Sequence, residues 1–430
     1  MNKLIDILER RFVPIASKIG SERHLVAVRD GFVVIMPLMI VGSMAVLVNN
    51  LPIEFYQNGL NAIFGGDGWK GFGSAISQGA FNIMSILVSF TIATNLARSY
   101  QRDGLTAGAV SLASLIVMTA AFTNEEGVSG LPFSWIGAQG LFIAIFVALV
   151  ATEVFTKLEN NERLVIKMPD GVPPAVAKSF ASLIPAMITV FIFALVRVLF
   201  NAAGVVDLHQ AFYNLLQAPI MKMANTLPTA ILIGLLNHLF WFFGLNGGSV
   251  LEPLMQSVYL PAIDQNIAAL AAGKEIPNIV TKSFFDAFVY LGGLGATIGL
   301  LIGVFLFTRK NKPYRIVTDL SLAPGLFNIN EPVMYGFPIV LNPILFIPIL
   351  MVPTILIIVS YFAISTGLVP KTIVLIPWTT PPVVGGFLAT GSWRGAALAL
   401  FNIVLATTLF LPFLKIAEKQ YLDKIGAAKE

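Results

Sequence analysis

The chain has 430 residues, of which 56% are hydrophobic and only 12% are charged, and its mean hydropathy is +0.82. Soluble domains carry roughly 25% charged residues, so this composition predicts an integral membrane protein without a large soluble domain. The net charge of +4 is expected from basic cytoplasmic loops rather than from nucleic-acid binding. The absence of cysteine excludes disulfides and thiolate metal sites, and the three histidines are too scattered to predict a metal site.

Long apolar runs begin after residues 1–30, which are polar and basic. This first stretch predicts a cytoplasmic N-terminal segment with no signal peptide. A transmembrane helix needs about 20 apolar residues. Runs of this kind predict helices over 31–48, 81–97, 105–122, 138–156, 179–200, 224–245, 287–307, 343–365 and 395–413.

Basic residues orient these helices, because cytoplasmic ends are enriched in Lys and Arg. Arg98 and Arg102 follow the second helix, whereas the loop 123–137 carries two glutamates and no basic residue. The loop is therefore expected outside the cell. The basic cluster at 309–315 falls inside only if 248–271 also crosses the membrane.

Segment 248–271 contains Pro253 and Pro261, so we expect a broken helix buried in protein, the alternative being an external helical loop. With this crossing there are about ten spans. The tail 416–430 then lies in the cytoplasm together with the N-terminus.

Three segments fit no ordinary span. Segments 317–340 and 370–392 are rich in Pro, Gly and Asn but too apolar for exposed loops, which predicts two re-entrant hairpins facing a protein-lined cavity. Segment 204–218 predicts an interfacial amphipathic helix that starts at an Asp207 N-cap. The predicted fold class is an all-α polytopic membrane protein with about ten transmembrane helices plus two re-entrant hairpins.

A single carboxylate, Glu331, lies in the stretch FNINEPVMYG at 327–336. A charged group at membrane depth costs about 2.5–3.5 kcal/mol on insertion scales, so it needs a partner or a function. Asn328 and Asn330 add amide donors and acceptors, and Pro332 favours an extended Glu331. Glu331 is expected to accept a hydrogen bond from a sugar hydroxyl, or else to cap the short helix that follows.

Two further stretches combine aromatic rings with polar groups. The first, at 237–249, contains His238, Trp241 and Asn246, and an aromatic face with an amide edge suits a pyranose ring. Its alternative is an interfacial aromatic belt with a buried core histidine. The second, at 376–393, places Trp378 and Thr379 before a Pro- and Gly-rich bend, which predicts another side of a sugar pocket or a buried structural turn.

Five motifs occur in one order along nearly the whole chain, and together they resemble a known family. They are RHLVAVRDG (23–31), WFFGLNG (241–247), GGLGATIGL (292–300), NINEPVMYG (328–336) and PWTTP (377–381). The chain resembles the membrane (IIC) subunit of lactose/cellobiose/diacetylchitobiose-type sugar phosphotransferase systems (PTS).

The resemblance implies a homodimer in the bacterial cytoplasmic (inner) membrane. A dimerisation domain of five transmembrane helices would span 31–203, and a transport domain containing both hairpins would span 219–415. It also implies that a β-linked disaccharide such as cellobiose or chitobiose is carried inward and phosphorylated by a cytoplasmic IIB subunit, with IIA upstream and no cofactor.

Glu331 matches the family's N-E-P glutamate, which contacts the C6 hydroxyl of the sugar, and we predict that Glu331 is the catalytic residue. Asn246 stands where the usual family motif W-x-x-G-x-H-G has histidine, so the resemblance leaves the sugar preference open. IIB carries the phosphate on a cysteine, and this chain has none, so the phospho-IIB donor is expected to be a separate protein.

Two other function classes are compatible with an intramembrane carboxylate. Glu331 would be the proton site of an ion-coupled sugar symporter, or the protein would be a membrane sensor that moves no sugar. ATP-driven transport is not expected, because the sequence has no P-loop.

Overall fold

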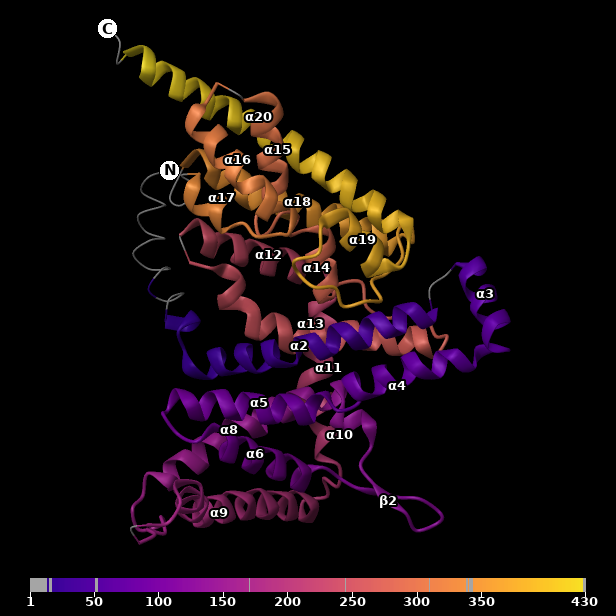
Figure 1. The fold of residues 1–430 in the computed structure, drawn as a ribbon, viewed down its shortest axis with the longest axis vertical. Coiled ribbons are helices and arrows are strands. Elements are labelled where there is room, and N and C mark those ends of the chain that lie inside the picture. Colours follow the sequence, from indigo (N-terminus) through magenta and orange to yellow (C-terminus); the bar gives the residue numbers. More distant parts are fainter. Residues whose placement is uncertain are drawn as a thin grey trace.

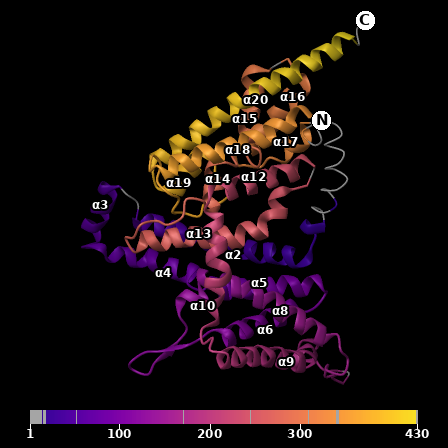
Figure 2. The same ribbon diagram turned by 180° about the vertical axis from the view of Figure 1, so that it is seen from behind.

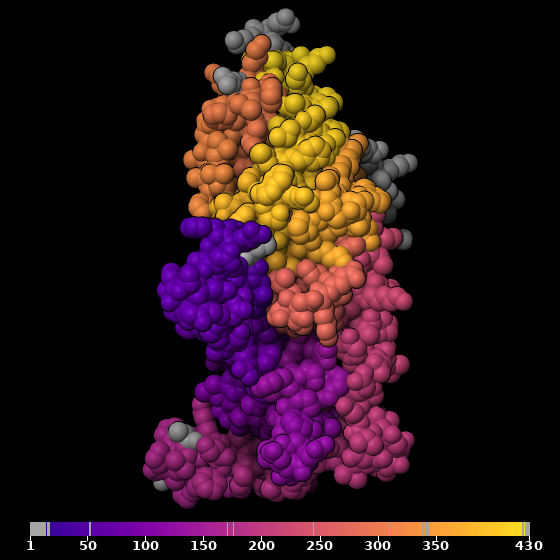
Figure 3. Space-filling model, turned by 90° about the vertical axis from the view of Figure 1, so that its right-hand side faces the viewer, coloured from indigo at the N-terminus to yellow at the C-terminus, as the bar shows by residue number. Residues whose placement is uncertain are grey.

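The molecule is elongated, with the end of α20 (Trp393–Ala427) at one end of its long axis, α9 (Pro174–Ala202) at the other and α2 (Arg23–Asn50) near the middle (Figures 1 and 3). The computed structural model describes residues 14, 18–50, 53–169, 171–243, 245–308, 310–337, 339 and 343–427. Within them the fold is almost entirely helical, and many helices are long and apolar. The predicted class of all-α membrane protein is therefore confirmed.

A first group of helices comes from the N-terminal half and occupies the lower part of Figure 1. It contains α2 (Arg23–Asn50), α3 (Glu54–Phe64), α4 (Lys70–Phe81), α5 (Met84–Ser99), α6 (Gly104–Met118), α7 (Phe133–Ile136), α8 (Leu141–Glu159) and α9 (Pro174–Ala202). Short 3-10 turns at Asp67–Trp69 and Ala138–Gly140 precede α4 and α8, and the strands β1 (Phe122–Thr123) and β2 (Ser129–Gly130) form a small hairpin.

A connecting helix joins the two halves and runs across the direction of α2 and α5, as both ribbon views show (Figures 1 and 2). It comprises α10 (Leu208–Phe212), a π-helical turn (Tyr213–Gln217) and α11 (Ala218–Ala224), and it meets the next helix at a bend of 80°. The Asp207 side chain accepts a hydrogen bond from Gln210 N at 3.0 Å, so the predicted N-cap is confirmed.

The second group comes from the C-terminal half. It contains α12 (Leu227–Phe242), α13 (Gly247–Ala271), α14 (Lys282–Phe288), α15 (Thr297–Phe307), α16 (Lys312–Leu326), α17 (Glu331–Gly336), α18 (Pro343–Ser365), α19 (Pro382–Thr390) and α20 (Trp393–Ala427).

Each predicted span contains a helix, but two differ in form from the expectation. Segment 248–271 is one continuous helix that contains Pro253 and Pro261, not a broken one. The span predicted over 287–307 is interrupted instead, because residues 289–296 form a glycine-rich turn before α15 begins. Among the described residues, six helices are long and apolar enough to cross a membrane alone, and the bent pair ending in α12 makes a seventh if it is counted as one span; α6 and α15 are shorter apolar helices.

Both predicted hairpin segments fold back on themselves. In 317–340, α16 is followed by a turn at 327–330 and then by α17, which packs against α16. In 370–392, residues 370–381 are irregular, with a turn at 378–380, and contact the end of α19, where Ile373 N donates to the Ala389 carbonyl at 2.7 Å.

The two groups of helices meet along α2 and α13. Ile35 and Met39 of α2 share one buried apolar cluster with Leu260 and Ile263 of α13. Ser43 of α2 also donates to the Leu375 carbonyl in the irregular part of the second hairpin, at 2.8 Å. One side of α2 therefore faces the C-terminal helices, and a cavity lies between them.

Candidate functional site

A cavity of about 350 Å³ lies between α2 and the C-terminal helices. Its volume is at the lower end of the roughly 300–1,000 Å³ typical of small-molecule sites. Most of its polar lining comes from α13, α14, the glycine-rich turn and the start of α17. The polar, charged and aromatic side chains that line it include Arg29, Asn237, Trp241, Asn246, Glu252, Lys282, Asp286, Tyr290, Asn328, Asn330, Glu331 and Trp378.

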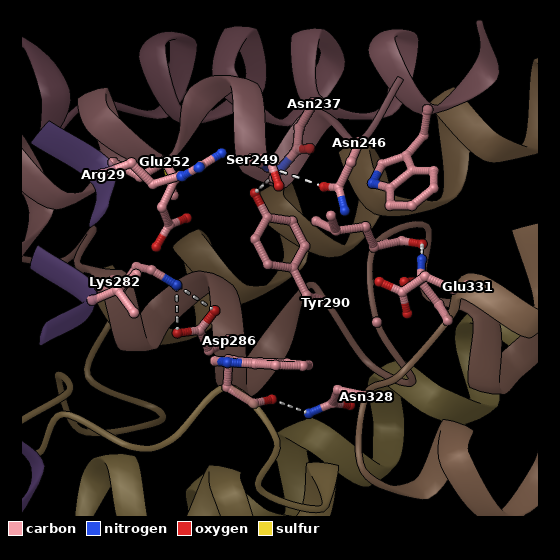
Figure 4. Close-up of a pocket in the computed structure, with 18 of the residues that line it drawn as sticks. Arg29, Asn237, Asn246, Ser249, Glu252, Lys282, Asp286, Tyr290, Asn328 and Glu331 are labelled. Carbon is pink, nitrogen blue, oxygen red and sulfur yellow. Dashed lines mark hydrogen bonds and ion pairs between the residues drawn. The ribbon is translucent and has the colours of Figure 1, made fainter. Parts of the chain in front are cut away.

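The charges in the cavity gather at two ends (Figure 4). Glu331 lies at one end, near Asn246. Arg29, Glu252 and the pair Lys282–Asp286 lie at the other end, with Tyr290 between the two (Figure 4). A ligand that reaches both ends must therefore offer hydrogen-bonding groups along its length.

Lys282 and Asp286 form a buried ion pair on α14. Lys282 Nζ lies 3.0 Å from Asp286 Oδ1 and 2.9 Å from Oδ2, and both side chains are almost completely buried. An ammonium has three donors, whereas a carboxylate has about four acceptor sites, so the pair retains capacity for a ligand. The i,i+4 spacing of Lys282 and Asp286 in an apolar stretch is a sequence signal for this pair, which the predicted site does not include.

Asn328 ties three segments together. It sits in the left-handed region with φ of +61° and accepts a hydrogen bond from Gly292 N at 2.8 Å. Its Nδ2 donates to the carbonyls of Trp378 at 2.6 Å and Thr380 at 2.9 Å. Both amide protons of Asn328 are thus used inside the protein.

The glycine-rich turn fits closely against the residues before α17. A Cβ on Gly293, where φ is +99°, would lie only 2.6 Å from the Asn328 carbonyl oxygen and from Asn330 Cβ. Asn330 Nδ2 donates to the Leu294 carbonyl at 2.7 Å. Only glycine allows this approach, and the contact fixes the chain immediately before Glu331.

Glu331 is the first residue of α17 and is exposed. Asn328 and Asn330 direct their amide nitrogens to backbone carbonyls, so they are not the donors for Glu331 that the sequence suggested. No hydrogen bond from the described residues reaches its carboxylate, which leaves both oxygens able to accept from a ligand.

The two tryptophans of the cavity differ in exposure. Trp378 is 48% exposed, whereas Trp241 is 1% exposed and packs edge-on to Tyr335 with ring centroids 6.1 Å apart. Trp378 therefore presents an exposed ring to the cavity, whereas Trp241 is mainly part of the wall.

Asn246 has a structural bond in addition to its place in the cavity. It is the N-cap of α13, and its Oδ1 accepts a hydrogen bond from Ser249 N at 3.0 Å. The amide nitrogen donates to no other described residue, so it is the part of Asn246 that a ligand can use.

His238 and Thr379, which were also predicted to bind substrate, do not line this cavity. His238 is buried on α12, and its Nδ1 is bonded to the Gly234 carbonyl in the preceding turn. Its neighbour Asn237 does line the cavity and donates to the Tyr290 hydroxyl at 3.1 Å.

A bundle of long apolar helices around a polar cavity with aromatic and charged walls defines the class of polytopic membrane proteins that bind small polar molecules. The particular family follows from comparison. The model of the family "Phosphotransferase system, EIIC" matches residues 29–353, and the chain belongs to this family. The family predicted from the five motifs is confirmed.

Characterised relatives are similar over nearly the full length. The cellobiose-specific EIIC component of Geobacillus stearothermophilus is 40% identical, covering 98% of this chain and 95% of the relative. The oligo-beta-mannoside-specific EIIC component of Bacillus subtilis (strain 168) is 36% identical, covering 99% and 96%. The crystal structure of the transporter ChbC, the IIC component of the N,N'-diacetylchitobiose-specific system, superposes with a TM-score of 0.92 at 38% identity, covering 98% of this chain and 99% of that one.

Proposed function

We propose that this protein is the permease of a PTS that binds a β-linked disaccharide in the cavity and carries it inward for phosphorylation. The relatives named for cellobiose and N,N'-diacetylchitobiose support this sugar class, because both sugars are β-linked disaccharides. The partners are the phosphorylated IIB protein, which supplies the phosphoryl group, and the IIA protein upstream of it.

The observation that carries the proposal is the separation of Glu331 from the charged cluster at the other end of the cavity (Figure 4). One sugar ring near Glu331 would stack on Trp378, since exposed aromatic faces bind the apolar faces of pyranoses. The second ring would reach Lys282, Asp286 and Glu252, whose charged groups form strong hydrogen bonds with hydroxyls.

Glu331 has the catalytic role in this proposal. Its carboxylate accepts the hydrogen bond of the sugar's C6 hydroxyl and takes the proton as the oxygen attacks the phosphorus of phosphocysteine on IIB. The new O–P bond forms while the S–P bond breaks, and the electron pair leaves with the cysteine sulfur. General-base help of this kind is typically worth about 10² to 10⁴ in rate.

Asn328 and Asn330 have a positioning role. Their amide groups hold the glycine-rich turn, the Trp378 loop and the start of α17 in one arrangement. They set the distance between the Trp378 ring and the Glu331 carboxylate rather than bind the sugar through their amide protons.

Three further properties belong to the proposal. The helices over 31–203 form the dimerisation domain, and the exposed apolar face of α9, with Phe191 63%, Leu195 59% and Val198 61% exposed, supplies surface for a partner copy or for lipid. The helices over 219–415 form the transport domain. Both termini lie in the cytoplasm, because basic residues gather before α2 and along the end of α20.

The test is a transport assay in vesicles that contain the purified protein, with a panel of labelled mono- and disaccharides. We expect a β-linked disaccharide to compete best and to appear inside as its phosphate only when phospho-IIB is present inside. Accumulation of unmodified sugar driven by a proton gradient would identify a symporter and overturn the proposal.

A further inference from the structure

A second cavity lies far from the sugar site along the chain, where the turn between α5 and α6 meets α8 and α9. It has a volume of about 460 Å³ and shares no lining residue with the first cavity. Its walls are the end of α5, the segment 101–105, the last residue of α8 and the second and third turns of α9. The basic residues at these helix ends place it at the cytoplasmic membrane surface by the positive-inside rule.

The lining of this second cavity carries both signs of charge. Arg98, Arg102 and Lys178 supply three cations, and Asp103 and Glu159 supply two carboxylates. Basic pockets between transmembrane helices on the cytoplasmic side are typical sites for phospholipid headgroups. Because Asp103 and Glu159 also line the cavity, a matching headgroup carries a cationic or hydrogen-bond-donating group in addition to its phosphate.

The two carboxylates are not equivalent. Asp103 is already satisfied as the N-cap of α6, since it accepts from Leu105 N at 3.3 Å and from Thr106 Oγ1 at 2.6 Å. The Thr106 hydrogen bond is the main reason that the pKa of Asp103 lies below its usual value, so Asp103 is ionised without a ligand.

Glu159 has one oxygen without a partner. Its Oε1 accepts a long hydrogen bond of 3.4 Å from Ser182, whereas Oε2 is buried and receives no hydrogen bond from the described residues. An unsatisfied buried acceptor costs about 1–3 kcal/mol. A donor that enters the cavity would remove this cost, and a primary ammonium offers three N–H groups.

The cavity lining includes one exposed apolar side chain. Leu105, in the first turn of α6, is 61% exposed. An acyl chain attached to a headgroup in the cavity would contact Leu105, whereas a free phosphate compound would leave this side chain uncovered.

We propose that this second cavity binds a phospholipid with an ethanolamine headgroup. The phosphate lies among Arg98, Arg102 and Lys178, and the ammonium donates to Glu159 Oε2. A glycerol headgroup offers Glu159 only neutral hydroxyl donors, whose hydrogen bonds to a carboxylate are weaker than those of an ammonium, and a choline headgroup has no N–H to donate. The site therefore selects ethanolamine over both.

The experiment measures lipid retained by the full-length protein in native mass spectrometry, after delipidation and addition of equal amounts of phosphatidylethanolamine, phosphatidylglycerol and phosphatidylcholine with the same acyl chains. We expect retention of phosphatidylethanolamine to exceed that of the other two roughly five- to tenfold. Glu159→Gln should remove this preference, and Lys178→Gln should weaken the binding of all three lipids. Equal retention of the three lipids by the wild-type protein would overturn the proposal.

The matched control is Glu162→Gln, because Glu162 is exposed, lies three residues after Glu159 and does not line the cavity. It should keep the preference, and a loss equal to that of Glu159→Gln would assign the effect to net charge and overturn the proposal. Sugar binding by each variant reports that the protein is folded. Soluble phosphoethanolamine tests whether the site binds a lipid or a free phosphate compound with the same headgroup. If it displaces phosphatidylethanolamine at equimolar concentration, the site does not select the lipid and the proposal is wrong. If displacement requires a large excess, the lipid is the ligand.

Discussion

Asn328 holds Trp378 at the cavity through a hydrogen bond of 2.6 Å from its Nδ2 to the Trp378 carbonyl. The two residues are 50 positions apart and belong to the two hairpin segments. The same nitrogen reaches the Thr380 carbonyl, while the Asn328 oxygen is bonded to Gly292. One side chain therefore controls how the Trp378 loop lies relative to Glu331.

Replacement of Asn328 with Asp should weaken sugar binding strongly. The carboxylate keeps the bond from Gly292 but brings an acceptor against the carbonyls of Trp378 and Thr380, and buried polar groups left unpaired cost about 1–3 kcal/mol each. We expect roughly a 10- to 100-fold loss of affinity, measured by isothermal titration, with a lower melting temperature. Asn214→Asp, at an exposed position outside both hairpin segments, is the control, and normal binding by the Asn328 variant would remove its positioning role.

The tryptophans should separate into a ligand contact and a packing residue. Trp378→Ala removes a half-exposed ring, so it should weaken sugar binding roughly tenfold or more and abolish a sugar-dependent change in fluorescence, with little effect on the melting temperature. Trp241→Ala empties a buried position and should cost about 3–5 kcal/mol of stability. Trp393, 70% exposed and outside the cavity lining, provides the control variant Trp393→Ala. The reverse assignment of the two effects would contradict the exposures on which this prediction depends.

Much of the fold followed from the sequence because hydropathy and basic residues constrain membrane helices strongly. The predicted spans all contain helices, and the Asp207 cap formed as expected. Proline was the weaker guide: Pro253 and Pro261 lie inside the intact helix α13. The break came instead at Gly292, Gly293 and Gly295, whose positive φ angles end the helical path.

Only some residues of the candidate site could be predicted from the sequence. Glu331, Trp378 and Asn246 were found because they stand in unusual local stretches. Lys282 and Asp286 were missed because the apolar span predicted over 287–307 began after them, and Arg29 was assigned to a cytoplasmic segment. Three-dimensional packing of α2 against α13, which no local pattern reports, brings Arg29 to the cavity.

Loss of the Lys282–Asp286 pair should lower both the stability of the protein and its affinity for sugar, and two variants can distinguish these effects. Lys282→Met leaves a buried carboxylate without its cation, and such a change typically costs about 3–5 kcal/mol. The double replacement Lys282→Met with Asp286→Leu should recover most of the melting temperature, because apolar residues replace both charges. Sugar affinity should stay low in the double variant if the pair binds the second ring. Full recovery of affinity together with stability would assign the pair to structure alone.

Asn246 should influence which disaccharide binds best. Asn246→His changes the donor facing the cavity and also loses the α13 cap, whose removal typically costs about 1 kcal/mol. Asn246→Asp is the matched variant, since its carboxylate keeps the cap and lacks the amide protons. We expect Asn246→His and Asn246→Asp to change the order in which disaccharides compete for the site. Asn246→Ala removes the cap and adds no donor, so it shows the effect of losing the cap alone. An unchanged order in both Asn246→His and Asn246→Asp would place Asn246 outside the recognition of the sugar.

Glu331→Gln tests the proposed chemistry, because the amide keeps the shape of the side chain and loses its charge. Hydrogen bonds to charged groups contribute roughly 1.5–3 kcal/mol, so sugar binding should weaken by about one to two orders of magnitude. Phosphorylation by phospho-IIB, measured at saturating sugar, should fall by a further 10² to 10⁴, since the proton acceptor is lost. The control Glu126→Gln, at an exposed residue of the β1–β2 loop, should change neither measurement. Equal losses in binding and in phosphorylation at limiting sugar, with normal turnover at saturation, would leave Glu331 a binding residue only. Normal values in both assays would make it the structural start of α17 and remove it from the mechanism.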